Sequence, residues 1–397
     1  GGLKLATKET HVAEGPIAPL NPPTRILMGP GPSMVPPRVY KALTTPLLGY
    51  GDPAFHRIMD DLRGLMRFVF NTKNELTFPV SGTGSAGMQT AVCNSLEPGD
   101  HIVVCINGFF GLRIADMAAR LGADVTRVEA EWGGTIDPAK VKAALDAKPR
   151  TKAVAIVHAE TSTGVLHPMA DIAQLARQYG ALLIVDTVTS LGGCPVEVDA
   201  WDADFVYSGT QKCVNVPPGL SPLTVSARGQ EALAARKSPV VDWYLDLSLI
   251  RGYWDGRVYH HTPPTSMIYA LYEGLAIIVE EGLDVRYQRH TTNARALHAG
   301  LEAMGLQLLV KPELRLPSLT TVRIPEGVDD AKVRGALLNQ HNIEIGGSVG
   351  ALAGKCWRIG LMGYGSTPQN VLGLLSSLNV VLNQQGFRAD GPAALAA

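Results

Sequence analysis

The sequence predicts a two-domain α/β protein whose larger domain is built around a mostly parallel β-sheet. The chain has 397 residues, which exceeds the size at which a single hydrophobic core stops growing. Apolar residues make up 46% of the chain and charged residues 18%, so a large interior can be buried. From about residue 76, short β-rich runs alternate with amphipathic stretches, a pattern that is typical of layered α/β domains.

The first part of the chain supplies the arm and the larger domain. Prolines at positions 16, 19, 22 and 23 disfavour regular structure, and they predict an extended arm over residues 1–24. The alternation that follows predicts the sheet and the helices that cover it. We expect strands at 76–80, 102–106, 125–129, 153–157, 182–186, 204–207 and 221–226, and helices at 85–96, 110–121 and 138–147.

The pattern changes after a long helical stretch that runs from Ser266 to Glu281 and meets Gly282. Beyond it the periodicity predicts a smaller α+β domain. We expect helices at 283–304 and 329–340, and strands near 306–310, 318–324, 343–345 and 357–361. The expected divisions are an arm at 1–24, a large domain at 25–282, a small domain at 283–388 and a disordered tail at 389–397.

Composition and charge exclude several classes of protein. Lysine plus arginine number 35 and aspartate plus glutamate 36, which leaves no electrostatic case for nucleic acid or an anionic membrane as partner. No apolar run approaches the roughly 20 residues that span a bilayer. The five cysteines are scattered without a CxxC pair, which favours a reducing compartment without structural zinc. With no readable secretion signal and no Ser-Lys-Leu type of terminus, a cytoplasmic location is expected.

The turn Ser81-Gly82-Thr83-Gly84-Ser85 is the first candidate for a chemical role. It follows a strand pattern and opens a helix, where glycines allow close approach of the backbone and helix amides suit a phosphate. Gly-Thr-Gly turns are also ordinary connectors between strands and helices. The turn by itself is therefore weak evidence.

Asp186 and Lys212 are the second and third candidates. Asp186 ends an apolar strand pattern, at the edge where open α/β sheets bind ligands, although an N-cap role is at least as common for such a residue. Lys212 follows the small and hydroxylated run Ser208-Gly209-Thr210-Gln211. There, partial desolvation lowers the pKa of a lysine and frees its amine, whereas a solvated loop lysine is the commoner case.

The three features together point to pyridoxal 5'-phosphate. This cofactor needs a cradle for its phosphate, an acid that keeps its pyridine nitrogen protonated and a lysine that forms a Schiff base. The chain offers the turn at 81–85, then Asp186, then Lys212, in that order. Few other cofactors require all three.

The chain resembles the class V, fold-type I aminotransferases, and within them the alanine–glyoxylate and serine–pyruvate group. Matching segments run nearly end to end. They are Leu27-Met28-Gly29-Pro30-Gly31-Pro32-Ser33, His158-Ala159-Glu160-Thr161-Ser162-Thr163-Gly164, Val185-Asp186-Thr187-Val188-Thr189-Ser190-Leu191-Gly192-Gly193, Ser208-Gly209-Thr210-Gln211-Lys212, Tyr259-His260-His261-Thr262 and Arg358-Ile359-Gly360-Leu361-Met362-Gly363.

The resemblance implies a role for each matching position. At the cofactor, the resemblance implies that the phosphate is bound by Thr83, Gly84, Ser85 and Gln211. It implies that Phe110 stacks on one face of the ring and that Val188 packs on the other. Thr161 is implied to contact the ring hydroxyl, and Asp186 to pair with the pyridinium. Tyr259 and Thr262 of one subunit are implied to reach the phosphate in the other, so the resemblance predicts a homodimer with shared active sites.

For the substrate, the resemblance implies that Arg358 captures the α-carboxylate, which its guanidinium fork suits. Considered alone, Arg358 would more commonly form an interdomain ion pair. Gly29, Gly31 and Gly346-Gly347 are implied to line a narrow pocket that suits alanine or serine. Relatives often carry Trp where Phe110 stands and His where Ser85 stands, so stacking and phosphate contacts are expected to differ in strength here.

The implied reaction is transfer of an amino group from alanine, or from serine, to glyoxylate by a ping-pong mechanism that gives glycine and a 2-oxo acid. A serine–pyruvate, serine–glyoxylate or 3-hydroxykynurenine aminotransferase, a related lyase, and a catalytically silent relative that binds a ligand or a partner remain alternatives.

For three other features of the sequence we predict a structural role rather than a chemical one. We expect His260 and His261 to point to opposite sides of a strand and to bind no metal. Cys213 is expected to be a packing residue rather than the mobile nucleophile of a desulfurase. The aromatic residues Trp243, Tyr244, Tyr253 and Trp254 are expected to pack at a dimer interface, with a substrate ring as the alternative.

Overall fold

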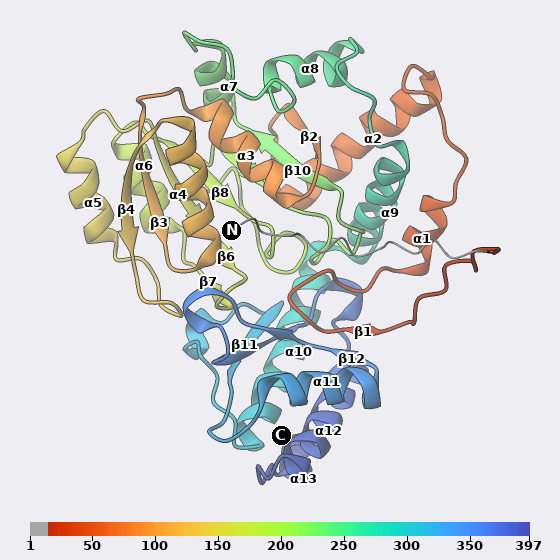
Figure 1. Cartoon of the computed structure of the whole chain (residues 1–397). Coiled ribbons are helices and arrows are strands. Elements are labelled where there is room, and N and C mark those ends of the chain that lie inside the picture. The colour runs from red at the N-terminus through yellow and green to blue at the C-terminus, as the bar shows by residue number, and fades with distance from the viewer. Residues whose placement is uncertain (1–14) are drawn as a thin grey trace, which may run out of the picture.

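The computed structural model describes residues 15–397 and contains a seven-stranded main sheet (Figure 1). Its strand order is β2-β10-β9-β8-β5-β3-β4. All neighbouring pairs are parallel except those that involve β10, which is antiparallel to both β2 and β9. The strands are β2 Leu76–Ser81, β3 His101–Ile106, β4 Asp124–Glu129, β5 Ala153–Val157, β8 Leu182–Asp186, β9 Phe205–Tyr207 and β10 Leu220–Val225.

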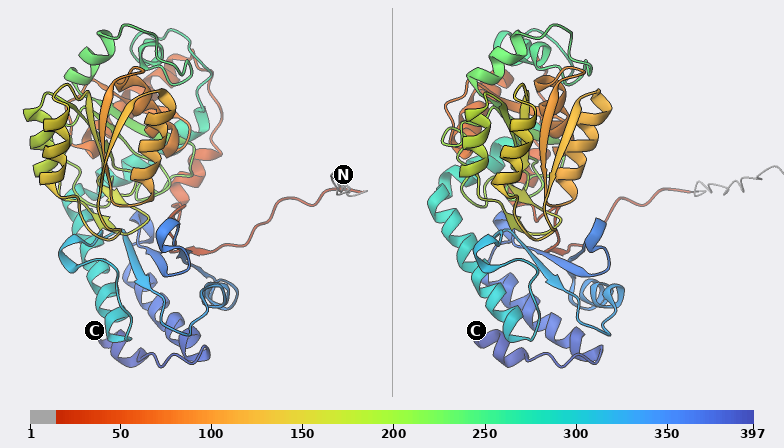
Figure 2. Two further views of the ribbon diagram at one scale, coloured as in Figure 1. Left: turned by 60° about the vertical axis from the view of Figure 1, so that its left-hand side comes forward. Right: turned by 90° about the vertical axis from the view of Figure 1, so that its left-hand side faces the viewer.

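Helices cover both faces of this sheet, as the edge-on view in Figure 2 shows. Every residue of β3, β5 and β8 is buried, which explains why these strands consist of continuous apolar runs rather than alternating patterns. The helices of this part are α1 Pro37–Leu43, α2 Pro53–Phe70, α3 Gly84–Ser95, α4 Phe109–Leu121, α5 Pro138–Ala147, α6 Ala170–Gln178, α7 Ala227–Ala234, α8 Leu247–Gly256 and α9 Thr265–Glu281.

A second layer of sheet and helices follows α9 and has its own apolar core (Figure 1). Its three-stranded sheet has the order β11-β14-β13. The strands are β11 Leu319–Arg323, β13 Gly346–Gly347 and β14 Cys356–Gly360, and the helices are α10 Leu283–Ala303, α11 Asp330–His341, α12 Pro368–Gln384 and α13 Gly391–Ala396. Short elements complete the chain: β1 Ile26–Leu27, β6 Ala159–Glu160, β7 Val165–Leu166, β12 Ile343–Glu344 and the 3₁₀ turns Pro312–Leu314, Gly350–Leu352 and Gly363–Gly365.

The start of the described chain belongs to this second unit, which corrects the expected boundary at residue 25. Strand β1 pairs in parallel with β12. Met28 is buried in the same apolar cluster as Ile345 and Trp357. The segment then crosses to the main sheet, so residues 26–28 bring the turn at 29–33 to the junction of the two units.

Two further expectations differ from the structure. The stretch at 306–310 forms no strand and makes only an isolated bridge between Leu308 and Val322. The stretch at 389–397 is not a disordered tail, because Gly391–Ala396 form α13 and Ala394 is buried. Asp390 caps α13 by accepting a hydrogen bond from the amide of Ala393, so a low-complexity alanine run still forms a helix where a cap and a packing surface are present.

The part of the expected arm that is described, residues 15–24, is exposed and contains neither helix nor strand, and residues 1–14 of that arm lie outside the described residues. No helix among the described residues has both the length and the apolar character that crossing a membrane requires.

Candidate active site

A cavity of about 210 Å³ lies at the carboxyl ends of the parallel strands, where open α/β sheets bind ligands. It brings together segments that follow β2, β3, β5, β8 and β9. The residues that line it are Thr83, Gly84, Ser85, Met88, Phe110, Arg113, Ala159, Thr161, Asp186, Val188, Gln211 and Lys212. Nine of these were singled out from the sequence, and the fold therefore places them around one space.

Asp186, the last residue of β8, has both carboxylate oxygens bonded and its side chain buried. Oδ1 accepts the amide of Val188 at 2.9 Å, and Oδ2 accepts the hydroxyl of Tyr207 at 2.9 Å. Burial raises the pKa of Asp186 to about 7. A positively charged ring nitrogen beside this carboxyl would favour its ionised form, because opposite charges lower the pKa of an acid. The bond from the amide of Val188 is the local contact that an N-cap residue would make, so this alternative role is present as well. The side chain of Asp186 nevertheless lines the cavity.

Lys212 is buried and lines the same cavity. Its amine donates a hydrogen bond to the carbonyl of Pro30, and its own carbonyl accepts the hydroxyl of Ser33 at 2.6 Å. Burial lowers the pKa of Lys212 to about 8, with a further contribution from the positive charge of Arg358. A lysine with a depressed pKa has an amine that is available to attack a carbonyl at neutral pH.

Gly31 is the residue that makes room for this lysine. Its φ is +107°, a conformation that favours glycine. A β-carbon at this position would lie 2.5 Å from Nζ of Lys212. Both the backbone and the lysine therefore require glycine here.

The turn before α3 forms a cradle in which two backbones approach closely. Thr83 is the N-cap residue of α3, and its side chain makes no capping bond. A β-carbon at Gly84 would lie 3.4 Å from Cγ2 of Val188 and 3.6 Å from Cα of Gly209. The amide of Ala86 donates to the carbonyl of Thr83 at 2.8 Å, which leaves the amides of Gly84 and Ser85 to face an anion.

Gln211 supplies an independent sign that a ligand belongs beside this cradle. Its Oε1 atom is buried and has no hydrogen-bond partner among the described residues. The oxygen and nitrogen of an amide exchange places on a flip, so this end of the side chain can present its NH₂ group to a phosphate. The glycine cradle, Gln211, Asp186 and Lys212 thus fit the phosphate, ring and aldehyde of pyridoxal phosphate.

Phe110 lines the cavity from the first turn of α4, and Glu160 fixes that turn. Glu160 is buried, and its carboxylate accepts the amides of Phe110 at 3.2 Å and Gly111 at 3.3 Å. It also accepts the hydroxyl of Ser162 at 2.7 Å. Burial raises the pKa of Glu160. A buried acid at the positive end of a helix is favourably placed, and it determines where the ring of Phe110 lies.

Arg358 and Thr161 connect the small sheet to the cavity. Arg358 lies on β14, and it donates to the carbonyl of Gly347 at 2.9 Å and to that of Thr161 at 3.3 Å. Burial lowers its pKa. The ion pairs of residues 15–397 do not include Arg358, so the interdomain ion pair considered from the sequence is replaced by a hydrogen bond across the junction. The Thr161 hydroxyl bonds that of Thr189.

Gly29 and Arg358 stand beside the cavity rather than among its lining residues. Gly29 is buried, and a β-carbon there would lie 3.4 Å from Oε1 of Glu344. Gly346 faces Pro30, with 2.4 Å between a β-carbon at this glycine and Cδ of the proline. These glycines allow the strands of the small unit to come close to the turn that holds Lys212.

Tyr259 and Thr262 do not line the cavity of their own chain. Tyr259 is 54% exposed, and its hydroxyl lies 3.2 Å from that of Thr262. The two residues belong to an exposed segment that is anchored by His260 and His261.

The pair His260 and His261 corrects the expectation of two side chains pointing to opposite sides of a strand. The segment is irregular, and the Nδ1 atoms of the two rings are 2.7 Å apart. Nε2 of His261 lies 2.7 Å from the hydroxyl of Ser81, next to the cradle. No group of three or more possible metal-ligating side chains occurs within residues 15–397.

The structure also shows where Cys213 and the aromatic residues at 243, 244, 253 and 254 lie. Cys213 is fully buried in an apolar cluster with Cys194 and Leu316, which confirms a packing role. Trp243 is 61% exposed and Tyr244 43% exposed, whereas Tyr253 and Trp254 are buried. The stretch therefore divides into an exposed pair and a core pair.

Sequence reasoning missed four residues that shape the site: Arg113, Glu160, Tyr207 and Asn215. Tyr207 was detectable, because it ends the strand that pairs with β8 and lies opposite Asp186 in register. Asn215 joins three segments, since its side-chain amide donates to Ser33, Met34 and Met362 while its oxygen accepts the amide of Tyr364. No local pattern signals such a junction, because its partners lie far apart in the sequence.

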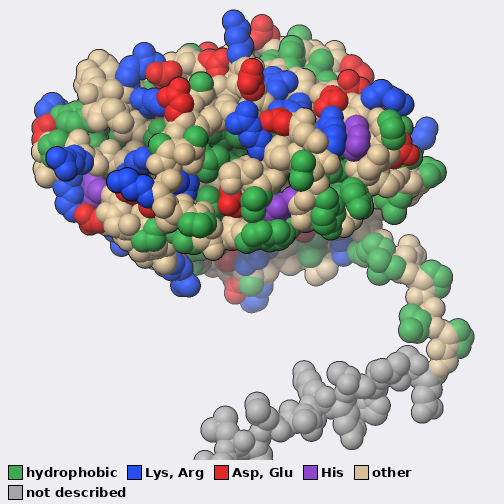
Figure 3. Space-filling view, turned by 90° about the horizontal axis from the view of Figure 1, so that it is seen from above, with side chains coloured by type: hydrophobic (Ala, Val, Ile, Leu, Met, Phe, Trp, Pro, Cys, Tyr) green, Lys and Arg blue, Asp and Glu red, His purple; other side chains and the backbone are tan. Residues whose placement is uncertain are grey.

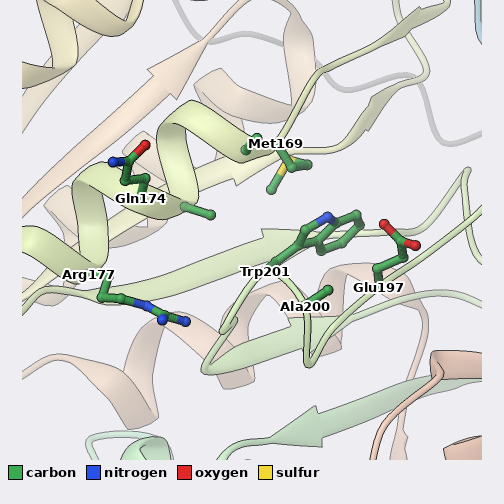
Figure 4. Close-up of a pocket in the computed structure, with 8 residues that line it drawn as sticks. Met169, Gln174, Arg177, Glu197, Ala200 and Trp201 are labelled. Atoms are coloured by element: carbon green, nitrogen blue, oxygen red, sulfur yellow. The ribbon is translucent and has the colours of Figure 1, made fainter.

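A second and larger cavity, of about 550 Å³, lies between α6 and the turn around residues 197–201 (Figure 4). Met169 and Trp201 form its apolar part, and Gln174, Arg177 and Glu197 stand at its margin. None of the residues singled out from the sequence lines it. Volume alone therefore does not identify the site, whereas the grouping of buried titratable residues does.

Comparison with known proteins agrees with this geometry. The family model described as "Aminotransferase class-V" matches residues 26–364. The chain is 41% identical to the (S)-ureidoglycine–glyoxylate transaminase of Bacillus subtilis, with 94% of each chain covered. It is also 41% identical to the alanine–glyoxylate aminotransferase of Callithrix jacchus, over 89% of this chain and 87% of that one. The crystal structure of an alanine–glyoxylate aminotransferase from Nostoc sp. superposes with a TM-score of 0.91 at 47% identity, over 92% of this chain and 97% of that one.

Proposed function

The chain belongs to the class-V aminotransferases, which are pyridoxal-phosphate-dependent enzymes, and we propose that it transfers the amino group of alanine to glyoxylate. The products are glycine and pyruvate. The observation that carries the proposal is the single cavity in which Asp186, Lys212 and the 83–85 cradle meet. The names of the relatives support glyoxylate as acceptor, since it is common to those that use alanine and to those that use ureidoglycine.

Each cavity residue has a proposed part in holding the cofactor. Thr83, Gly84, Ser85 and Gln211 hold the phosphate. Phe110 and Val188 enclose the ring from its two faces, and Thr161 contacts the ring hydroxyl. The cofactor supplies an aldehyde that joins an amine and a ring that accepts electrons from the substrate carbon.

Asp186 holds a proton at the ring nitrogen. Its carboxyl is buried, with a pKa of about 7, and it is already bonded to Tyr207 and to the amide of Val188. These bonds fix the plane of the carboxyl group, so its remaining lone pairs face the cavity. An ionised Asp186 next to a protonated ring nitrogen is a charge-assisted pair in surroundings that contain little water.

Lys212 moves the proton of the substrate. The Nζ atom lies inside the cavity, and its pKa is about 8. An amine with a pKa close to the working pH is an effective general base and then an effective acid. We propose that Nζ takes the proton from Cα of alanine and later gives it back.

Arg358 orients the donor by binding its carboxylate. Its guanidinium is buried and bonded to the carbonyls of Gly347 and Thr161, so its direction is set before substrate arrives. We propose that Gly29 and Gly347 line a narrow pocket beside it, which favours the methyl side chain of alanine over larger groups. Serine is the next donor in size.

The arrangement also supports a homodimer in which each subunit contributes Tyr259 and Thr262 to the phosphate of its partner. Hydrophobic side chains gather along the lower edge of the view in Figure 3, on the side where the extended N-terminal segment leaves the body. Aromatic rings around the 259–262 segment contact one another. The exposed Tyr50 lies 5.0 Å from Tyr259, and the exposed Trp243 lies 4.3 Å from the buried ring of His260, measured between ring centroids. Exposed aromatic clusters of this kind are typical of subunit interfaces.

The five cysteines are free and buried, which fits a reducing compartment, and we propose the cytoplasm as the site of the reaction.

The test is a series of half-reactions on the purified holoenzyme. Alanine, serine and (S)-ureidoglycine are added one at a time while the visible absorption of the bound cofactor is followed, and glyoxylate or pyruvate is then added. We expect alanine to bleach the visible band and glyoxylate to restore it, with glycine as product. Bleaching by ureidoglycine but not by alanine would assign the donor of the Bacillus subtilis relative instead. A band that no amino donor changes would contradict transamination.

A further inference from the structure

We propose that Arg113 supplies the positive charge that balances the cofactor phosphate, acting together with Ser85. The inference rests on the proposed function, because it assumes that pyridoxal phosphate occupies the cavity. Arg113 lies in the second turn of α4 and lines the same cavity as the 83–85 cradle.

The charges around the cavity leave this task to Arg113. Among the lining residues, only Arg113, Asp186 and Lys212 carry ionisable side chains. We assign Asp186 to pairing with the ring nitrogen and Lys212 to bonding with the aldehyde, so neither is available to neutralise the phosphate. A phosphate monoester carries between about −1.5 and −2 charges at neutral pH, whereas a helix N-terminus offers only about +0.5. A further cation is needed, and Arg113 is the one available within the cavity.

The contacts of Arg113 hold it in place for this role. Nη1 donates a hydrogen bond to the hydroxyl oxygen of Ser85 at 3.2 Å. The guanidinium carbon lies 5.0 Å from the ring centroids of both Phe109 and Phe110, which form an edge-to-face pair. The ion pairs found within residues 15–397 do not include Arg113, so its charge is not already neutralised by a carboxylate there.

Ser85 gains a defined orientation from the same bond. A hydroxyl has one proton to donate and lone pairs that accept. Since its oxygen accepts from Arg113, its proton is free to point into the cavity, next to the amides that begin α3. Arg113 and Ser85 thus form one donor group, with the serine presenting the hydrogen bond and the arginine the charge behind it.

Arg113 has a second possible role, which the experiment must separate from the first. The guanidinium packs against Phe110, and a cation above an aromatic ring is attracted to it. Removing Arg113 could therefore displace Phe110 and loosen the cofactor ring, with no involvement of the phosphate. A phosphate-free analogue distinguishes the two roles, because pyridoxal keeps the ring and the aldehyde.

The experiment measures how fast pyridoxal phosphate and pyridoxal leave the loaded full-length enzyme. Release is followed by loss of the visible band after dilution into a carbonyl scavenger, at low salt and at 0.5 M salt. The variants are Arg113→Gln, Arg113→Lys, Ser85→Ala and the double variant Arg113→Gln/Ser85→Ala. The matched control is Arg120→Gln, an exposed arginine of the same helix that pairs with Asp116.

We expect Arg113→Gln to speed the release of pyridoxal phosphate about 30-fold and that of pyridoxal less than about 3-fold, as the loss of a charge-assisted bond predicts. The difference should shrink at high salt, which screens the charge. Arg113→Lys should lie between, and the double variant should resemble Arg113→Gln alone because the two residues act as one group. Arg120→Gln should change neither rate.

Equal acceleration of both compounds by Arg113→Gln would overturn the proposal and assign Arg113 to the packing of Phe110. Unchanged release of both would overturn it as well. If Arg113→Gln fails to fold, Arg113→Lys and Ser85→Ala still carry the comparison between the two compounds. A wild-type enzyme that retains no pyridoxal phosphate would contradict the proposed function itself, whereas an active wild-type enzyme without phosphate selectivity in the variants would contradict only the role of Arg113.

Discussion

The Asp186–Lys212 side of the cavity and the Tyr259–Thr262 segment differ in how they are held. Asp186 and Lys212 are buried, and residues of the same chain bond to them. Tyr259 and Thr262 are exposed and bond mainly to each other. One region is complete within the chain, and the other presents polar groups outward.

This difference separates the chemistry that one chain can supply from the part that we assign to a second copy. Burial shifts the pKa values of Asp186 and Lys212 toward neutrality, which prepares them for proton transfer. In a single chain, Tyr259 and Thr262 remain exposed to water. Their hydroxyl groups can bind a ligand strongly only where another molecule excludes water from them. Substitutions in the two regions should therefore impair the enzyme in different ways.

The largest effect is expected for Lys212. Lys212→Ala removes both the anchor and the base, and we expect turnover to fall by about 10⁴-fold, at the upper end for loss of a general base. Steady-state assays with alanine and glyoxylate measure this. Lys212→Arg serves as the control, because it keeps a cation at this position without the nucleophilic amine, and it should be equally inactive. Substantial turnover in either variant would remove Lys212 from the mechanism.

The next effect is expected for Asp186, and it has opposite signs for activity and stability. Asp186→Asn should lower turnover about 1000-fold, because an amide does not hold the ring nitrogen protonated. In the full chain freed of cofactor, the same change should stabilise the fold. The folded pKa of Asp186, about 7, lies above its ordinary value of 3.8, so the contribution of this residue is fully present below pH 3.8 and is lost as pH rises through 7.

Thermal melting at pH 4 and pH 8 tests the sign. Asp186→Asn should melt with the wild-type chain at pH 4 and several degrees above it at pH 8. Asp61→Asn, an exposed change within α2, is the control and should match the wild-type chain at both values. A variant that is less stable than wild type at pH 8 would show that the carboxylate is favourable in the empty site.

The role of the exposed 259–262 segment is tested by mixing two variants, one altered in this segment and one altered at Lys212. Tyr259→Phe/Thr262→Ala would remove the two hydrogen bonds that we assign to the phosphate in the partner subunit, and we expect cofactor affinity to fall about 100-fold. If these residues act in the partner subunit, a mixed dimer with Lys212→Ala contains one site with every group intact. Refolding the two variants together at a limiting cofactor concentration should restore roughly a quarter of wild-type activity, given random pairing into dimers. No restoration would mean that Tyr259 and Thr262 serve their own chain.

How much of this site could be read from the sequence depends on how local each signal is. The strands that end at Asp186 and begin at Leu76 were predicted within a residue, because their apolar runs are local features. Glu160 was not singled out, since its partners on α4 lie about 50 residues away. The burial of α13 likewise depends on α10 and α12, and an alanine-rich sequence does not reveal what it packs against.

The smallest effect concerns the histidine pair that anchors the exposed segment beside the cradle. The carbonyl of Trp243 only accepts, so Nε2 of His260 donates to it at 3.2 Å, and Nδ1 of His260 accepts from Nδ1 of His261. Nε2 of His261 then accepts from Ser81. A protonated His261 donates at both nitrogens, so it no longer accepts from Ser81, and the serine hydroxyl must turn to accept instead.

Protonation of His261 therefore weakens its bond to Ser81. Burial lowers the pKa of His261, and the charge of His260 lowers it further, so the stability from this chain of bonds is present above the ordinary value of 6.5 and is lost as pH falls. Between pH 7 and pH 5 we expect cofactor release from the wild-type enzyme to accelerate about 3-fold, the cost of one weakened hydrogen bond. His261→Gln removes the titrating ring, and the release rate of this variant should rise less over the same range. An identical pH profile in the variant would show that the exposed segment is held independently of these histidines.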